Sequence, residues 1–511
     1  MVLHKTDSTM NNTKLDEEEL GKKEVLEKTL AGGQWFFLTT LVQRIVSLIV
    51  FFITARLLTP ADFGLIALAG LIPALIDTHT AIGFEAALVQ KREGEEIAYL
   101  DSTWTFNVLR AGITFIIVFF SAPFVAKFFH APQAILLFQL SGLSVFIQGW
   151  TNIGQIYFSR NLEFKKFFIR DMSLIVSTSI VSIIGAYFFH SYWALFAGNT
   201  LGILIITLST YLLHPYRPHF DFKLRKLRPL LGYSKWLFGQ EILNQISYAL
   251  ENFMVGHVAS TANMGLYGKA KSLAQAPTAP LSSIIGKINL STYIKVRDSY
   301  GHVREGFYKS FELLACVGIP FLFAIYIAGN HIIHILLGDA WLDIIPILNI
   351  LIIHFTLNAM TMTALPIFNA LGEPRTGFRL SVLHWITMLF CLFLLVPKFG
   401  VFGASYSLLI ATIVLMIPTM IFLHKLITIS WWRVVSSLFV VIFSTIIPSA
   451  IGYLVLQHGW GSKTMSFLII GTLLAMLYLV LIFLIGKITK KGPYQTLQLI
   501  MGSFFRKKFA I

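Results

Sequence analysis

The amino-acid sequence predicts an all-α integral membrane protein with fourteen transmembrane helices, arranged as two pseudo-symmetric six-helix lobes followed by two C-terminal helices. Three observations support this fold class. The chain is 56% hydrophobic and only 13% charged, about half the charged share of an ordinary soluble domain. Its apolar runs reach the roughly 20 residues that a helix needs to span a bilayer. Two parts of the chain also repeat. Barrel strands are excluded, because the runs are too long and do not alternate with period two.

The fourteen predicted spans are defined by their length and apolar composition. In chain order they cover residues 34–57, 63–84, 102–126, 133–158, 167–189, 192–214, 230–257, 264–292, 307–329, 344–370, 376–397, 401–424, 433–456 and 464–487.

The internal repeat appears when Trp35 is laid on Trp236 without a gap. The alignment then pairs Phe37 with Phe238, Ile45 with Ile246, Phe52 with Phe253, Ala61 with Ala262, Gly64 with Gly265, Leu65 with Leu266 and Ala69 with Ala270. A second match pairs Thr151 with Thr361, Phe158 with Phe368, Glu163 with Glu373 and Lys165 with Arg375. Each copy has an even number of spans, so both run the same way through the membrane. Their symmetry axis is therefore expected along the membrane normal.

Lysine and arginine in the short connections predict the topology. They gather in the connections that are cytoplasmic when both termini are inside, which agrees with the positive-inside rule and accounts for most of the net charge of +15. Contact with anionic headgroups explains these loops better than nucleic-acid binding does. We expect a cytoplasmic N-terminal tail (1–30), an N-lobe (31–214), a cytoplasmic inter-lobe linker (215–229), a C-lobe (230–424), helices thirteen and fourteen (425–490) and a basic cytoplasmic C-terminal tail (491–511).

Polar side chains inside four predicted spans recur at helical spacing and occupy matched places in the two repeats. Gln43 aligns with Asn244, and Gln148 aligns with Asn358. Bonding between neighbouring helices would account for any single amide, but four matched stripes favour a shared polar cavity. The predicted sugar-binding residues of this cavity are Gln43, Gln148, Asn152, Asn244, His354 and Asn358.

Ionisable residues at membrane depth sharpen this prediction, because a charge there costs at least ~2.5 kcal/mol unless it is paired or hydrated. The predicted diphosphate or anion ligands are Arg44, Arg110, Lys235 and Lys287. The two lysines could instead be anchors near a helix end, and the arginines could pair with acids. Asp77, Glu241 and Glu251 are candidates for ion coupling or for counter-ions. Lys269 and Lys271, nearer the outer end of their span, receive no role.

No catalytic, metal or cofactor site is predicted. Cys316 and Cys391 both lie in apolar segments, where a small buried hydrophobe is the simplest interpretation. The chain has no nucleotide-binding G-x-x-x-x-G-K-[ST] run. Transport would therefore be driven by a proton or sodium gradient, or by removal of the product on the far side.

The run from Thr54 to Leu65, TARLLTPADFGL, resembles the first hairpin of bacterial polysaccharide flippases, and so does the run from Gly83 to Gln90. The stretches Gly265–Tyr267 and Leu371–Arg375 are also similar to these O-antigen and exopolysaccharide flippases. These flippases form part of the multidrug/oligosaccharidyl-lipid/polysaccharide exporter superfamily. The resemblance extends over roughly residues 30 to 490 and is greatest to the colanic-acid or succinoglycan type of exporter.

The resemblance implies two lobes facing across a V-shaped cavity in the bacterial cytoplasmic (inner) membrane. It implies translocation of undecaprenyl-diphosphate-linked sugar repeat units by alternating access, for surface polysaccharide and lipopolysaccharide biosynthesis. The expected partners are this lipid-linked oligosaccharide, membrane lipids, a coupling proton or sodium ion, and polysaccharide polymerase or assembly proteins. One alternative is a cation-coupled drug or metabolite antiporter, which needs an acidic cavity. The other is a membrane-embedded glycan polymerase or ligase, which needs a larger outer loop than residues 330–343.

Overall fold

The computed structural model describes residues 35, 38–80, 88, 97–161, 163–223, 235–297, 299–458 and 464–489. All regular secondary structure in these ranges is helical. Nine of the described helices are long and apolar enough to cross a membrane. The chain is therefore a multi-pass membrane protein with an all-helical fold, as the composition predicts.

The first part of the chain folds into a helix at Leu38–Leu57 and a series of helices packed in antiparallel pairs. These are α2 (Pro60–Thr80), α4 (Ile97–Phe128), η1 (Pro132–Ala134), α5 (Ile135–Gly149), η2 (Ile153–Gln155), α6 (Ile156–Arg160), α7 (Phe164–Phe189) and α8 (Trp193–Leu213). Helix α4 packs on α5, and α7 packs on α8.

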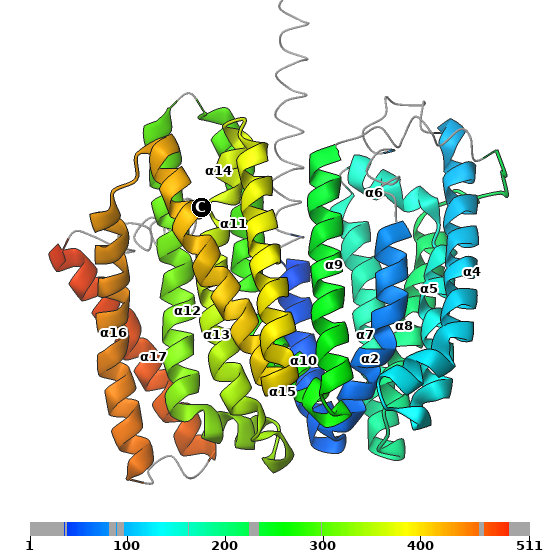
Figure 1. Ribbon diagram of the computed structural model, residues 1–511, viewed down its shortest axis with the longest axis horizontal. Helices are drawn as coiled ribbons and strands as arrows, with labels where there is room; N and C mark the ends of the chain where they lie inside the picture. The colour runs from blue at the N-terminus through cyan, green and yellow to red at the C-terminus, as the bar shows by residue number, and fades with distance from the viewer. Residues whose placement is uncertain are drawn as a thin grey trace, which may run out of the picture.

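The second part contains α9 (Lys235–Val258), α10 (Thr261–Gln275), α11 (Ala279–Lys295), α12 (Tyr300–Leu336), η4 (Asp339–Trp341), α13 (Ile344–Met362), α14 (Leu365–Ala370), α15 (Pro374–Ile427), α16 (Trp431–Gln457) and α17 (Thr464–Thr489). Figure 1 shows α2 and α4 to α8 on one side of the molecule and α11 to α17 on the other, with α9 and α10 between them.

Each predicted span contains a helix in the described residues, but three of the spans are broken. The span 133–158 divides into α5, η2 and α6, and the span 344–370 divides into α13 and α14. The span 264–292 divides into α10 and α11 at residues 276–278, beside Pro277 and Pro280, because proline cannot donate the backbone hydrogen bond of a continuous helix. The number of membrane crossings stays a prediction.

Helix α15 covers two predicted spans, 376–397 and 401–424, in 54 residues. Its course breaks at Gly400, where φ is 54° and ψ is −128°. Such a conformation is accessible mainly to glycine. A Cβ added at Gly403 would lie only 2.2 Å from the carbonyl oxygen of Leu395. The two arms of α15 therefore meet at a very tight turn.

Helices α2 and α10 cross at the same pair of glycines that the repeat aligns. A Cβ added at Gly64 would lie 1.8 Å from the carbonyl oxygen of Thr261, and one added at Gly265 would lie 1.8 Å from that of Pro60. Pro60 and Thr261 are themselves separated by the repeat offset of 201 residues. The two glycines occupy equivalent positions in the repeat, and so do the two carbonyl groups that they meet. A two-fold axis between the helices produces such a reciprocal contact.

The start of the predicted linker is fastened to the N-terminal end of α4. Asp101 accepts hydrogen bonds from the Tyr216 hydroxyl at 2.7 Å and from the His219 backbone N–H at 2.9 Å. Ser102 donates to Asp221 at 2.8 Å. Burial, together with the Asp101 carboxylate, raises the pKa of Tyr216. Residues 214–223 are therefore an ordered segment that is held against the N-terminal end of α4.

Helix α16 is attached to α12 by a cluster around Arg433. This guanidinium forms two hydrogen bonds with the Glu305 carboxylate, one of them at 2.9 Å, and lies 4.2 Å from the centre of the Tyr308 ring. Ser437 donates to the buried Glu312 at 2.8 Å. A bidentate arginine–carboxylate pair has a defined geometry, so the cluster sets how α16 lies on α12.

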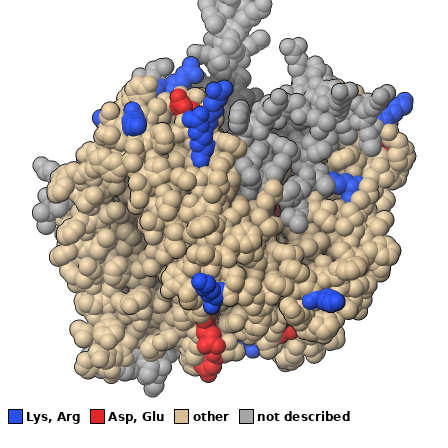
Figure 2. All heavy atoms as spheres, viewed as in Figure 1, with Lys and Arg blue, Asp and Glu red and all other residues tan. Residues whose placement is uncertain are grey.

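Large apolar side chains cover the outside of the helices. Leu212 is 87% exposed and Phe124 is 79% exposed, which is unfavourable in water but normal against lipid. On the face shown in Figure 2, uncharged side chains cover most of the surface, and the Lys and Arg side chains lie toward its upper part and its lower part. Both observations agree with a protein embedded in a bilayer.

Candidate functional site

A cavity of about 600 Å³ lies between the first helix, α2, α7, α8, α9 and α10. Its walls combine apolar side chains with amides and hydroxyls, which include Gln43, Ser47, Thr178, Asn199, Asn252 and Gln275. Lys269 and Lys271 of α10 supply its positive charge. A volume of 300–1,000 Å³ with a few placed polar groups is typical of small-molecule sites.

Lys271 forms an ion pair with Glu251 of α9. The Tyr267 hydroxyl also donates to Glu251, at 2.6 Å, and both Glu251 and Tyr267 are buried. The Lys271 ammonium lies 4.8 Å from the centre of the Tyr248 ring. Glu251 thus compensates one of the two cavity lysines, and the pair links α9 to α10.

Lys269 has different surroundings. Its ammonium lies 4.7 Å from the centre of the Phe51 ring and 4.5 Å from that of Phe63. Among the residues that the structure describes, no carboxylate pairs with it. Ring faces attract a cation only weakly compared with a full negative charge. The cavity therefore keeps a net positive charge in the described part of the chain.

Contacts between distant parts of the chain lie at one end of the cavity, where Trp341 packs against the lining residues Phe51 and Phe63. We infer that these contacts close this end, and we call it the closed end. The Trp341 indole N–H donates to the carbonyl oxygen of Ala55 at 2.8 Å. Arg56 donates to the carbonyl oxygens of Ile335 and Leu336, in the last turn of α12, where helix carbonyls lack partners and attract cations. The crossing of α2 and α10 adds to this closure, since Gly265 and Phe63 both line the cavity.

Three of the predicted site residues lie on the first helix and α4. Gln43 lines the cavity, as the polar stripe suggests. Arg44 is exposed on the same helix and Arg110 is half-buried on α4; neither belongs to the residues that line this cavity. Their part in binding an anion stays a prediction.

The other described candidates lie away from the cavity. Gln148 is exposed near the end of α5, and Asn358 is half-buried on α13. Asn152 is fully buried; it accepts from the Gly154 N–H at 2.9 Å and donates to the Tyr216 carbonyl at 2.7 Å. His354 is buried 2.9 Å from the Thr412 hydroxyl. In this conformation Asn152 caps the start of η2, and His354 connects α13 to α15.

The remaining candidates have side chains outside the described residues. Lys235, Glu241 and Asn244 belong to α9, Lys287 belongs to α11, and Asp77 belongs to α2. Only their helices are placed.

Sequence reasoning missed the two lysines that line the cavity. A signal for them was present in the repeat, because Lys269 and Lys271 stand where the first copy has Leu68 and Gly70. A charge that replaces an apolar residue at a repeated position marks the place where the two copies differ. Their place toward the outer end of the span was noted, but it gave them no role.

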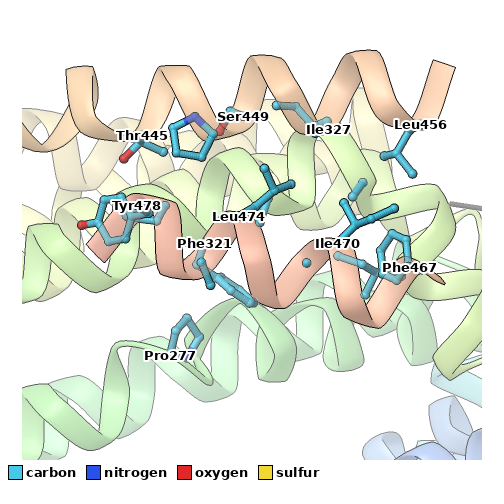
Figure 3. Close-up of a pocket in the computed structure, with 18 of the residues that line it drawn as sticks. Pro277, Phe321, Ile327, Thr445, Ser449, Leu456, Phe467, Ile470, Leu474 and Tyr478 are labelled. Carbon is cyan, nitrogen blue, oxygen red and sulfur yellow. The ribbon is translucent and has the colours of Figure 1, made fainter. Parts of the chain in front are cut away.

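A second cavity, of about 410 Å³, lies between α12, α16 and α17 and is almost entirely apolar. Figure 3 shows Phe321 and Ile327 of α12, Leu456 of α16, and Leu474 and Tyr478 of α17 around it. This chemistry suits a hydrocarbon chain and not a sugar.

A multi-pass bundle with a polar, basic cavity enclosed between repeated helices defines a membrane transporter. Comparison with known families makes the assignment specific. The family model described as "Polysaccharide biosynthesis protein" matches residues 53–346, which is more than half of the chain. The chain belongs to this family, and the match includes the hairpin that carries the sequence resemblance.

Curated relatives agree with this membership. The chain is 23% identical to the lipopolysaccharide biosynthesis protein WzxC of Escherichia coli K12, over 74% of this chain and 75% of WzxC. It is 20% identical to the teichuronic acid biosynthesis protein TuaB of Bacillus subtilis, over 64% and 68% of the two chains. It is 22% identical to the succinoglycan biosynthesis transport protein ExoT of Rhizobium meliloti, over 64% and 66%.

Solved structures show the same fold. The lipid II flippase MurJ in an inward closed conformation superposes with a TM-score of 0.71 at 14% identity, over 89% of this chain and all of that one. An inward-facing multidrug resistance MATE transporter of the MOP superfamily superposes with a TM-score of 0.56 at 14% identity, over 75% and 95%. At this identity the likeness concerns the fold alone.

Proposed function

We propose that this protein is a flippase that moves undecaprenyl-diphosphate-linked oligosaccharide repeat units across the bacterial cytoplasmic membrane for surface polysaccharide synthesis. The basic cavity with Lys269 and Lys271 on its wall carries the proposal. A diphosphate is the most highly charged part of such a substrate, and an incompletely compensated cation in a cavity favours its binding. WzxC, TuaB and ExoT bear names from polysaccharide biosynthesis, and MurJ is a flippase of a lipid.

The polar and apolar parts of the proposed substrate match the chemistry of the two cavities. Lys269 and Lys271 would bind the diphosphate, and Gln43, Asn199 and Asn252 would donate to and accept from sugar hydroxyls. The isoprenoid chain would remain in lipid or enter the apolar cavity between α12, α16 and α17. The predicted roles of Arg44, Arg110, Lys235 and Lys287 as further anion ligands belong to this proposal. They apply to conformations in which the cavity opens wider.

Translocation would proceed by alternating access between an N-lobe (31–214) and a C-lobe (230–424) with fourteen spans and both termini inside. The positive-inside pattern places the α9–α10 connection, and with it the closed end, on the outer side. The conformation described here would then be the one that accepts substrate from the cytoplasmic side. Exposure to the outer side requires the closed end to open.

Ion coupling is assigned to the acids Asp77, Glu241 and Glu251 as a proposal. Glu251 acts as a counter-ion in this conformation, because it binds Lys271 and Tyr267. If the substrate diphosphate takes Lys271 as its partner, Glu251 is left buried without a cation and favours protonation. Binding of the anion and of a proton would then support one another.

The basic cavity argues against an antiporter for cationic drugs, because the Lys269 ammonium on its wall has no paired carboxylate among the described residues and repels a cation. A membrane-embedded polymerase needs an outer catalytic loop, and residues 330–343 are instead the end of α12 and the short helix η4. Transport without catalysis is the function that the geometry supports best.

The test uses purified protein in liposomes that contain a fluorescent undecaprenyl-diphosphate-linked oligosaccharide. The protein should accelerate its movement between leaflets, and Lys271→Gln should slow this movement at least tenfold. Lys425→Gln, an exposed lysine at the end of α15, is the matched control and should leave the rate unchanged. Equal rates in protein-free liposomes and with the parent protein would overturn the proposal. Efficient export of a cationic drug by the parent protein would favour the antiporter.

A further inference from the structure

The cavity lysine Lys269 and the closed-end residue Trp341 share the same two aromatic neighbours. Lys269 lies over the rings of Phe51 and Phe63, at 4.7 Å and 4.5 Å from their centres. The Trp341 ring meets the same two rings edge to face, at centroid distances of 5.7 Å and 5.2 Å. Phe51 and Phe63 also meet edge to face, at 5.8 Å. One packed cluster thus joins the cavity charge to the closed end.

The contacts of this cluster span three separate parts of the chain. Phe51 belongs to the first helix, one turn before Ala55, whose carbonyl oxygen accepts the hydrogen bond of Trp341. Phe63 belongs to α2, and Trp341 follows α12 in η4. Trp341 is fully buried, and Phe51 and Phe63 are nearly so. A displacement of either phenylalanine therefore changes the packing of the Trp341 side chain, since close-packed groups leave no free space into which a ring could move.

The Lys269 ammonium stabilises the packing around Trp341 through its contacts with the two phenylalanine rings. An ammonium over an aromatic face is held by the ring quadrupole, and the attraction is larger when the site is shielded from water. A phosphate oxygen competes for the same ammonium with a full charge and direct hydrogen bonds, which are stronger. An anion in the cavity will therefore draw Lys269 off the two rings.

We propose that Lys269, Phe51, Phe63 and Trp341 form a sensor that opens the closed end when a diphosphate occupies the cavity. In the empty protein, the Lys269 ammonium holds the two rings against Trp341, and Trp341 closes the end by donating to Ala55. When the anion takes Lys269, the rings lose this support and Trp341 leaves its seat. The sensor rests on the proposed function, since it supplies the step by which a loaded cavity turns outward. It also keeps an empty cavity closed on that side.

The experiment measures how accessible the closed end is. Ala55 is buried beneath Trp341, so Ala55→Cys in a background with Cys316→Ala and Cys391→Ala reports opening by its rate of reaction with a hydrophilic maleimide. Inorganic pyrophosphate is the probe ligand, sulfate at equal ionic strength is the control, and calorimetry measures pyrophosphate binding independently. Should Ala55→Cys not fold, Leu342→Cys beside Trp341 is the second reporter.

Pyrophosphate should accelerate the reaction of the parent reporter protein, and sulfate should not. Lys269→Gln should react at least roughly 2- to 30-fold faster than the parent without ligand, because a single cation–ring contact already accounts for that range and Lys269 makes two. Pyrophosphate should add nothing. Phe51→Leu should still bind pyrophosphate but no longer respond to it. This variant separates the sensor from simple binding, because the lysine is intact.

Three results would overturn the sensor. If pyrophosphate binds the parent but leaves its reaction rate unchanged, the closed end ignores the cavity, although the proposed transport stands. If Phe51→Leu responds like the parent, the aromatic cluster does not transmit the signal. If calorimetry shows no pyrophosphate binding to the parent, the diphosphate site and the sensor are both wrong. Failure of glycan movement in liposomes with an intact pyrophosphate response would instead refute the proposed substrate alone.

Discussion

A single methyl group added at the crossing of α2 and α10 should act on the closed end more strongly than its size suggests. Gly64→Ala would place a Cβ 1.8 Å from the carbonyl oxygen of Thr261, and Gly265→Ala would place one 1.8 Å from that of Pro60. Both obstacles are backbone atoms of a helix, so no side chain can rotate to make room. The two helices must move apart.

The size of this displacement follows from ordinary contact distances. Non-bonded heavy atoms prefer separations of about 3.5 Å, so relief of a clash at 1.8 Å needs a movement of roughly 1.7 Å. Overpacking of this kind costs about 1–3 kcal/mol. Because the crossing closes one end of the cavity, the chain can relieve the strain by opening there, and the closed conformation loses this free energy relative to the open one. A difference of that size changes the populations by roughly 5- to 150-fold.

The assay combines the Ala55→Cys labelling rate with thermal unfolding of the same proteins. Gly70→Ala on α2 and Gly268→Ala on α10 are the matched controls, because a Cβ at either place meets nothing within 4 Å. Gly64→Ala and Gly265→Ala should each be labelled faster than these controls. The double variant should add little, since one separation of the helices makes room for both methyl groups.

Control-like labelling and control-like melting in both crossing variants would refute this reasoning, because backbones in such close contact cannot accept a methyl group silently. Lower melting temperature with unchanged labelling would show that the strain unfolds the protein and does not open its closed end.

Three further predictions follow from the sequence and the fold. Reporter fusions at residues 220 and 300 should read inside and those at 128 and 336 outside, and an outside signal at 220 would contradict the proposed topology. Arg44→Ala should abolish glycan export at normal protein abundance and Arg44→Lys should restore it in part, since lysine lacks the guanidinium fork; rescue of a folding defect by Asp77→Ala would show an ion pair instead. Arg433→Lys should lower the melting temperature by a few degrees through loss of the bidentate bond to Glu305, and an unchanged melting curve would contradict the assigned role of this cluster.

The positions of the helices could be predicted from the sequence because the bilayer imposes a length and a composition on every span. The repeat could also be predicted, and its alignment of Gly64 with Gly265 identifies the crossing of α2 and α10. Breaks inside a span were harder to predict. Pro277 marks one of them, whereas the division between α13 and α14 depends on packing between helices and leaves no strong mark in composition.

The site was predicted less well than the fold. Gln43 does line the cavity, as expected for a polar stripe that faces a polar neighbour, while its part in sugar binding stays a prediction. The same logic does not distinguish a cavity from a local bond, and Asn152 and His354 show the second outcome, in a helix cap and a contact with Thr412. Lys269 could not be chosen by depth alone, because its aromatic neighbours come from helices more than 200 residues earlier.

The sharp turn at Gly400 couples the two arms of α15 to one another. Its two arms meet with too little chain between them for one to slide past the other, so we expect them to move together as one hairpin. One arm cannot follow α9 while the other stays with α13, although α15 packs against both. We therefore expect a rearrangement that moves α9 to move α13 as well, so that this glycine turn links the motions of the two helices.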